Sequence, residues 1–225
     1  MDGKSPNPLI AWIQSSARKS LPRAQEMLTQ IRSQLGEGAW GQQFLPWQAL
    51  EKPALLGLLL QEGLSLSRLD AHPDYNEYGP RGLALFLDVP LETHAYFDAA
   101  GIEGISEDAC SRLGKKAIDK GQVNSFRALH KSHPQFIEGA VLREPSVVCV
   151  GAMSRYLQSP SKKNLEMLRV VNAIGPRWED LERQSLFITS KNKQIFEAVV
   201  RDLYAERLAG AWSSPAAPSR SRPRL

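Results

Sequence analysis

The sequence contains few cysteines and no long apolar run. Cys110 and Cys149 are its only cysteines, so a zinc site built on two cysteine pairs is excluded, and both are expected to be small buried hydrophobes kept reduced. The apolar run at residues 54–60 is far shorter than the roughly 20 residues that span a bilayer. The apolar patch at residues 8–13 is too short for the core of a signal peptide. We therefore expect a cytoplasmic protein without membrane insertion.

The sequence also lacks the strings that mark common catalytic and cofactor sites. It contains no HExxH, CxxC or GxSxG string, and its glycines stand apart as helix stops rather than forming a phosphate loop. His130 and His133 lie at i, i+3, but no third metal ligand is suggested nearby. The loop from Asp70 has Tyr75 and Arg81 where a calcium loop needs Gly and Glu. We expect no metal, no cofactor and no enzymatic activity.

Positive charge is concentrated near the C-terminus. The net charge is +4 at pH 7, and three arginines within the last six residues carry most of it. Residues 213–225 are dominated by Pro, Ser and Arg without a hydrophobic face, which predicts a disordered basic tail. A second basic stretch alternates with acidic residues, which favours a solvated helix face. Its residues that would contact phosphate in a nucleic acid are Lys115, Lys116, Lys120 and Arg127.

Amphipathic helical patterns, by contrast, recur along the chain. In residues 163–175, Leu165, Leu168 and Val171 fall at helical spacing, Gly175 ends the helix, and Pro176 prevents its continuation. We call this thirteen-residue pattern the frame. It also fits residues 51–63, 89–101, 121–133 and, more weakly, 191–203. Shorter apolar segments that would form the first helix of each pair precede the later frames, at residues 82–87, 109–118, 147–157 and 181–188.

These patterns predict an all-α fold. Residues 1–50 would form an N-terminal helical cap of two helices and an aromatic loop that contains Trp40, Phe44 and Trp47. Residues 51–212 would form stacked helical hairpins, each made of helix, short turn, helix and longer loop. Because the frames start at irregular intervals of 28 to 42 residues, an irregular helical bundle is the alternative.

The frame resembles the second helix of an ankyrin repeat. The stretches KNLEMLRVVNAIG and KPALLGLLLQEG match its pattern best, whereas the Thr-Pro-Leu-His motif of the first helix corresponds only to Arg81-Gly82-Leu83-Ala84. The resemblance covers about residues 50 to 205 and implies an ankyrin-like array. In such an array the loops between repeats project along one edge and bind partner proteins.

Aromatic side chains in these loops are the candidate contacts with a partner. Tyr75 and Tyr78 combine large apolar area with a polar group and lie in a polar loop closed by Gly79-Pro80. The alternative is that each aromatic side chain packs beneath its own loop. The candidate partner-binding residues are Tyr75, Asn76, Tyr78, Arg81 and, from a comparable loop, Trp178.

These features favour a non-enzymatic protein-binding module. General appearance, rather than any motif, suggests a bacterial accessory inhibitor or adaptor acting on a larger complex, such as a plasmid-encoded inhibitor of conjugative transfer or a secreted effector. The alternatives are a nucleic-acid-associated basic protein and an enzyme built on Glu92, His94 and Asp98. The enzyme is disfavoured because residues 92 and 98 largely face different ways on one helix.

Overall fold

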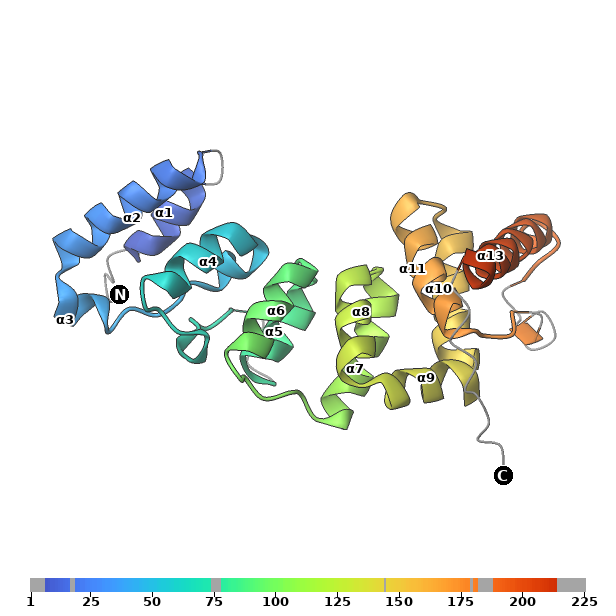
Figure 1. Cartoon of the computed structure of the whole chain (residues 1–225). Helices are drawn as coiled ribbons and strands as arrows, with labels where there is room; N and C mark the ends of the chain where they lie inside the picture. The colour runs from blue at the N-terminus through green and yellow to red at the C-terminus, as the bar shows by residue number, and fades with distance from the viewer. Residues whose placement is uncertain are drawn as a thin grey trace, which may run out of the picture. The chain divides into compact units, whose positions relative to one another are not determined.

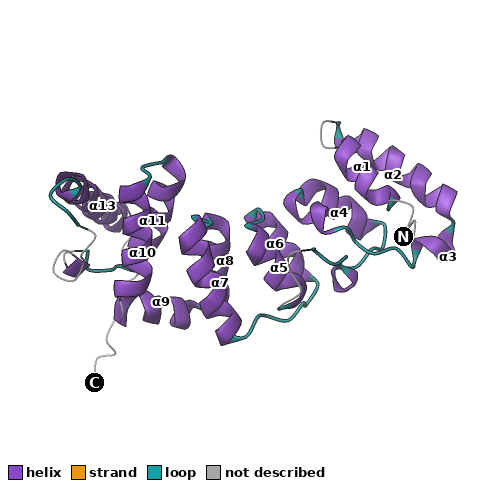
Figure 2. Cartoon of the chain, turned by 180° about the vertical axis from the view of Figure 1, so that it is seen from behind, coloured by secondary structure: helices purple, strands orange, loops and turns teal. Residues whose placement is uncertain are grey.

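The computed structural model describes residues 7–16, 19–73, 78–143, 145–178, 180–181 and 188–213. These residues form twelve α-helices and two short 3-10 helices without a strand, so the all-α prediction is confirmed (Figure 2). No helix among them is both long enough and apolar enough to cross a membrane. The chain divides into two compact units, one ending at Phe136 and the other beginning at Ile137.

The first unit contains eight of the α-helices (Figure 1). They are α1 (Pro8–Ser16), α2 (Leu21–Leu35), α3 (Glu37–Trp40), α4 (Pro53–Gln61), α5 (Gly79–Leu87), α6 (Leu91–Ala99), α7 (Glu107–Lys120) and α8 (Val123–Ser132). Along the chain, the 3-10 helix η1 (Trp47–Glu51) precedes α4 and the 3-10 helix η2 (Leu66–Arg68) follows it. The second unit contains α10 (Pro145–Gln158), α11 (Lys162–Ile174) and α13 (Lys193–Ser213), and α9 (Pro134–Arg143) begins just before the boundary.

A single hydrophobic core joins α1 to α6 in the first unit. Leu9, Trp12, Leu28, Leu56 and Phe97 are fully buried within it. The indole Nε1–H of Trp12 donates a hydrogen bond to the carbonyl oxygen of Ala24 at 2.9 Å, so α1 and α2 are joined by a buried polar contact as well. Leu50 and Leu55, on either side of the expected end of the N-terminal cap, belong to this same core.

Four consecutive helices of the first unit end in the same hydrogen-bonded motif. After each helix a residue with positive φ turns the chain, and the N–H that follows it bonds to the carbonyl oxygen five residues earlier, as in a Schellman motif. The turning residues are Gly63 (φ 89°), Asp88 (57°), Gly101 (63°) and Gly121 (63°). The bonds run from Leu64 to Leu59, Val89 to Ala84, Ile102 to Phe97 and Gln122 to Ala117. The glycine stops expected at positions 63 and 101 are therefore confirmed.

Helix α11 has nearly the predicted bounds, 162–174 rather than 163–175. The Oγ of Ser161 caps its N-terminus by accepting a hydrogen bond from the N–H of Asn164 at 3.2 Å. Gly175 ends it with φ 99°, and its N–H bonds to the carbonyl oxygen of Asn172 at 3.0 Å. Pro176 has no N–H to continue the motif. Leu168 is fully buried on the inner face, as the periodicity predicted.

Helices pack as neighbouring pairs in each unit. The pairs are α5 with α6, α7 with α8, and α10 with α11, and Figure 1 shows each pair side by side. Helix α5 also packs against α7 and α8, which joins the first two pairs. The first helices expected at residues 82–87, 109–118 and 147–157 correspond to α5, α7 and α10. The one expected at 181–188 falls mostly outside the residues that the structure describes.

Helix α9 lies between the frame at residues 121–133 and the first helix expected at residues 147–157. The frame over residues 121–133 is followed at once by Pro134, the first residue of α9. Proline suits the first position of a helix because the N–H it lacks has no partner there. The proline therefore ends α8 and also starts the next helix.

Candidate functional site

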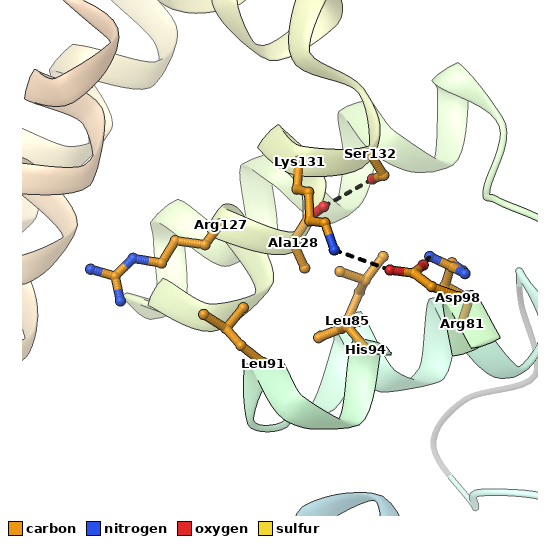
Figure 3. A pocket seen from close by; sticks show the side chains of 9 residues that line it. All are labelled: Arg81, Leu85, Leu91, His94, Asp98, Arg127, Ala128, Lys131 and Ser132. Atoms are coloured by element: carbon orange, nitrogen blue, oxygen red, sulfur yellow. Dashed lines mark hydrogen bonds and ion pairs between the residues drawn. The ribbon is translucent and has the colours of Figure 1, made fainter. Parts of the chain in front are cut away.

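A pocket of about 400 Å³ lies between α5, α6 and α8 in the first unit (Figure 3). Its residues recur at steps of three or four along each helix, so each helix turns one face to the pocket. The contributions are Arg81 and Leu85 from α5, Leu91, His94 and Asp98 from α6, and Arg127, Ala128, Lys131 and Ser132 from α8.

Asp98 is held between two cations in this pocket. Its Oδ1 lies 2.9 Å from Nη1 of Arg81, and its Oδ2 lies 3.1 Å from Nζ of Lys131. The hydrogen bond from Arg81, and after it the one from Lys131, holds the pKa of the Asp98 carboxyl below its usual range. Asp98 is therefore ionised at neutral pH.

The two cations differ in how firmly they are held. The Arg81 side chain is only 13% exposed, and its Nη2 also donates to the carbonyl oxygen of Ile102 at 3.1 Å. The Arg81 guanidinium lies 5.9 Å from the ring centroid of Phe97, within the range of a cation–π contact. The Lys131 side chain is 76% exposed. Arg81 is thus part of the pocket wall, whereas Lys131 lies at its mouth.

His94 forms a buried polar part of the same pocket. His94 is only 7% exposed, and this burial lowers the pKa of its imidazole to about 4. The charge of Arg81 is the second cause of the lowered pKa, Lys131 adds to it, and Asp98 opposes it. The imidazole is therefore neutral at pH 7. Within the described part of the chain, neither His94 Nε2 nor Arg81 Nε has a hydrogen-bond partner.

The pocket combines charged side chains with an apolar wall. Three cations, Arg81, Arg127 and Lys131, and one carboxylate, that of Asp98, line it. In Figure 3 the Lys131 amine points toward Asp98 and the Arg127 guanidinium points away from it. Leu85, Leu91 and Ala128 supply the apolar wall. Such a pocket suits an anionic group attached to an apolar one.

Ser132 contributes a hydroxyl at the edge of the pocket. Its Oγ lies 2.9 Å from Nδ1 of His133, and His133 Nε2 lies 3.0 Å from the carbonyl oxygen of Ile105. The same hydroxyl lies 2.9 Å from the carbonyl oxygen of Ala128, four residues earlier. A bond of this kind is common for serine in a helix, so the hydroxyl has a structural partner independent of the imidazole.

The predicted partner-binding residues are scattered. Tyr75 and Asn76 lie outside the described residues. Tyr78 is half-buried and adopts a left-handed conformation, with φ 64°, just before α5. Arg81 lies in the pocket wall rather than on an exposed loop.

Trp178 corrects one expectation, because its side chain is fully buried. Its indole Nε1–H donates to Oδ1 of Asn172 at 2.9 Å, and its backbone N–H donates to the hydroxyl of Tyr204 at 3.0 Å. The alternative, that the aromatic side chain packs inside rather than contacts a partner, therefore holds for Trp178. The loop after Gly175 carries it into the core of the second unit, where a tryptophan with a satisfied N–H is stable.

The four predicted phosphate-contacting residues do not share one environment. Lys115 and Lys120 are exposed on α7. Lys116 instead lies over the ring of Phe86, 2.7 Å from its centroid, and its Nζ donates to the Phe86 carbonyl oxygen at 3.3 Å. Burial, and then the charge of Lys120, lowers the pKa of Lys116. Arg127 is exposed on α8 and is the one member of this set that lines the pocket.

Of the three residues weighed as an enzyme site, His94 and Asp98 meet in the pocket, and Glu92 does not line it. The spacing of residues 94 and 98, i, i+4 on one helix, was the sequence signal for this pocket. The contribution of Lys131 from another helix had no such signal, because it depends on how α6 and α8 pack.

Metal-ligating and thiol groups form no further site among the described residues. No three His, Cys, Asp or Glu side chains there lie close enough together to hold a metal ion. Cys110 and Cys149 are free and buried, and burial raises the pKa of their thiols to about 11 and about 12. Both behave as small hydrophobes, as expected.

The pocket has to be interpreted from its own chemistry. No known protein family, no curated protein and no solved structure matches this chain.

Proposed function

We propose that the chain is a non-enzymatic protein-binding module whose pocket between α5, α6 and α8 receives an acidic part of a partner protein. The observation that carries this proposal is a lining of three cations and one carboxylate beside the apolar wall of Leu85, Leu91 and Ala128. Protein interfaces combine apolar centres with charged groups that select the partner. The form of this function that we propose is an adaptor or inhibitor that occupies an acidic surface of a larger complex.

Ankyrin-like stacking of helical hairpins is part of the proposal. It is supported by the pairs α5–α6 and α7–α8, with α5 packed against both helices of the following pair. It is also supported by the positive φ at Gly63, Gly101 and Gly175, the glycines of the matching frames. Stacked helical repeats offer an extended surface to a partner, which suits a binding module.

Lys131 is well placed to exchange partners. Its ion pair with Asp98 is solvent-exposed, and such pairs typically contribute only about 0 to 1 kcal/mol. A carboxylate from a partner replaces this contact at small cost. The exposed charge of Lys131 also attracts an acidic surface before contact, which raises the association rate at low salt.

Site-specific photo-crosslinking tests the proposal. In the full chain, Leu91, which is 39% exposed in the pocket, is replaced by p-benzoylphenylalanine in the native cell. The matched control carries the same residue at Leu21, which is 48% exposed on α2. We expect a discrete protein adduct from position 91 that position 21 does not give, and its loss when Arg127 and Lys131 are both changed to Glu. Identical adducts from both positions, or an adduct that survives the charge reversal, would contradict the proposal.

Nucleic-acid association is the second candidate. It is favoured by Lys115 and Lys120, both exposed on α7, together with exposed Arg127 on α8. A gel shift with random DNA and RNA at two salt concentrations tests it, because phosphate contacts release counterions and weaken steeply with salt. Tight, strongly salt-dependent binding that Lys115→Gln with Lys120→Gln abolishes would establish this candidate over the first.

A further inference from the structure

We propose that the pocket between α5, α6 and α8 binds the C-terminal carboxylate of a partner protein, with the apolar side chain of the last residue against Leu85, Leu91 and Ala128 (Figure 3). This inference rests on the protein-binding function proposed above and names the part of the partner that is recognised.

The size of the pocket favours a chain end. Its volume of about 400 Å³ lies near the lower limit of ligand pockets, which range from about 300 to 1,000 Å³. An internal Asp or Glu brings backbone into the site from two directions. A C-terminal residue brings backbone from one direction, and its carboxylate and side chain branch from the same carbon atom. A chain end therefore delivers both groups to a small pocket with a charged side and an apolar side.

The charged side of the pocket can release a cation to the ligand. Asp98 binds both Arg81 and Lys131, and Arg81 is the more buried of the two cations. When Lys131 turns to a ligand carboxylate, Asp98 keeps its 2.9 Å contact with Arg81 Nη1. The exchange therefore leaves neither carboxylate without a cation.

Two buried nitrogens supply a second, independent observation. Within the described residues, His94 Nε2 and Arg81 Nε have no hydrogen-bond partner, and the His94 residue is more than nine-tenths buried. Such unpaired buried groups are uncommon in native proteins. Because His94 also lines the pocket, we infer that its Nε2 serves the ligand. In its Nε2–H tautomer the ring then donates to a carboxylate oxygen of the ligand.

Peptide titrations followed by NMR test the inference on the full chain. The probes are acetylated Gly-Ser-Gly-Ser-X peptides, with X being Leu, Phe, Val or Ala, each as the free acid and as the C-terminal amide. We expect the best acid to shift the amide signals of Leu91, His94 and Lys131 saturably and to bind about tenfold more tightly than its amide. Lys131→Gln should weaken the acid about fivefold. Lys162→Gln, which removes an exposed lysine on α11 in the other unit, should leave its affinity unchanged.

Three outcomes overturn the inference. The first is equal binding of acid and amide, and the second is equally tight binding of 4-methylpentanoate, which would identify a small carboxylate as the ligand. The third is tighter binding of an internal-Asp peptide, acetyl-Gly-Ser-Asp-Leu-Gly-Ser-amide. If the adduct from position 91 still forms in these cases, only the C-terminal recognition fails. If that adduct is absent as well, the protein-binding function fails with it.

Discussion

The Oδ1 atom of Asp88, at the end of α5, accepts a hydrogen bond from the backbone N–H of Ser125 on α8 at 3.0 Å. Asp88 also has φ 57°, so it is the non-glycine member of the four Schellman motifs. The hydroxyl of Ser125 donates to the carbonyl oxygen of Leu85 at 2.6 Å. One aspartate therefore ends a helix and holds the next hairpin against it.

Replacing Asp88 separates these two roles. Asp88→Ala should destabilise the first unit by about 2 to 4 kcal/mol, because it removes a charged acceptor and places a Cβ-bearing residue without a polar side chain at positive φ. Asp88→Gly should cost less, since glycine tolerates this backbone conformation, and Asp88→Asn should cost least. Hydrogen exchange of the α5 and α8 amides measures the differences. If Asp88→Ala and Asp88→Asn exchange alike, the contact with Ser125 contributes little.

Asn172 has a comparable role in the second unit. It is buried, its Nδ2 donates to the carbonyl oxygen of Leu203 at 2.8 Å, and its Oδ1 accepts from Trp178 at 2.9 Å. Asn172→Ala leaves two buried groups unpaired, so we expect a loss of about 2 to 5 kcal/mol. Denaturant unfolding followed by the indole N–H signal of Trp178 in NMR measures it. Lys191→Ala, at an exposed turn position before α13, is the control and should change the midpoint little.

The sequence predicted the helices well where local chemistry determines them. Periodicity located α11 to within one residue, and the glycines at 63 and 101 adopt the conformation that ended the predicted helices. The rule that a glycine ends the helix gives no signal at Asp88, because aspartate at positive φ depends on a partner from a different helix, Ser125. Local patterns therefore predicted helix ends only where glycine alone suffices.

The pocket was predictable only in part. Arg81, predicted as a partner-binding residue, lies in the pocket, as do His94 and Asp98, which the sequence offers only for a disfavoured enzyme site. For Trp178 the sequence leaves both a partner contact and a packed position open, because a tryptophan in a loop carries no sequence signal for the Asn172 side chain that accepts its N–H. Residues that meet through packing between helices, such as Asp98 and Lys131, have no fixed spacing in the sequence.

The stability of the first unit should depend on pH through His94. Three charged groups face its imidazole, namely Arg81 from α5, Asp98 from α6 and Lys131 from α8. The folded-state pKa is about 4 and the ordinary value is 6.5, so the unfolded chain binds the proton more tightly. Stability is therefore fully present above pH 6.5 and falls as the pH drops toward 4, by up to about 3 kcal/mol.

Unfolding of the wild type and of His94→Gln by urea between pH 4 and 8 measures this dependence. The variant should lose the part of the slope that lies between pH 6.5 and 4, because glutamine does not titrate. His130→Gln, in which the changed histidine is only partly buried on α8, should keep that slope. Equal slopes for the wild type and His94→Gln would show that the imidazole is not protected from protonation in the folded protein.

Gly57 of α4 lies against Tyr96 of α6. A Cβ built on Gly57 lies 2.6 Å from the Tyr96 hydroxyl and 3.4 Å from its Cζ atom. Gly57→Ala gains about 1 kcal/mol of helix propensity but forces this contact apart, so we expect a net loss of about 1 kcal/mol. In a Tyr96→Phe background the nearest atom is Cζ, at an almost ordinary distance, and the same change should be neutral or stabilising. A double-mutant cycle from urea unfolding measures the coupling, which should exceed about 1 kcal/mol. Coupling near zero would mean that α6 shifts away from the added methyl group without a measurable cost. The contact between α4 and α6 would then not fix the position of α6 or of His94 and Asp98 on it.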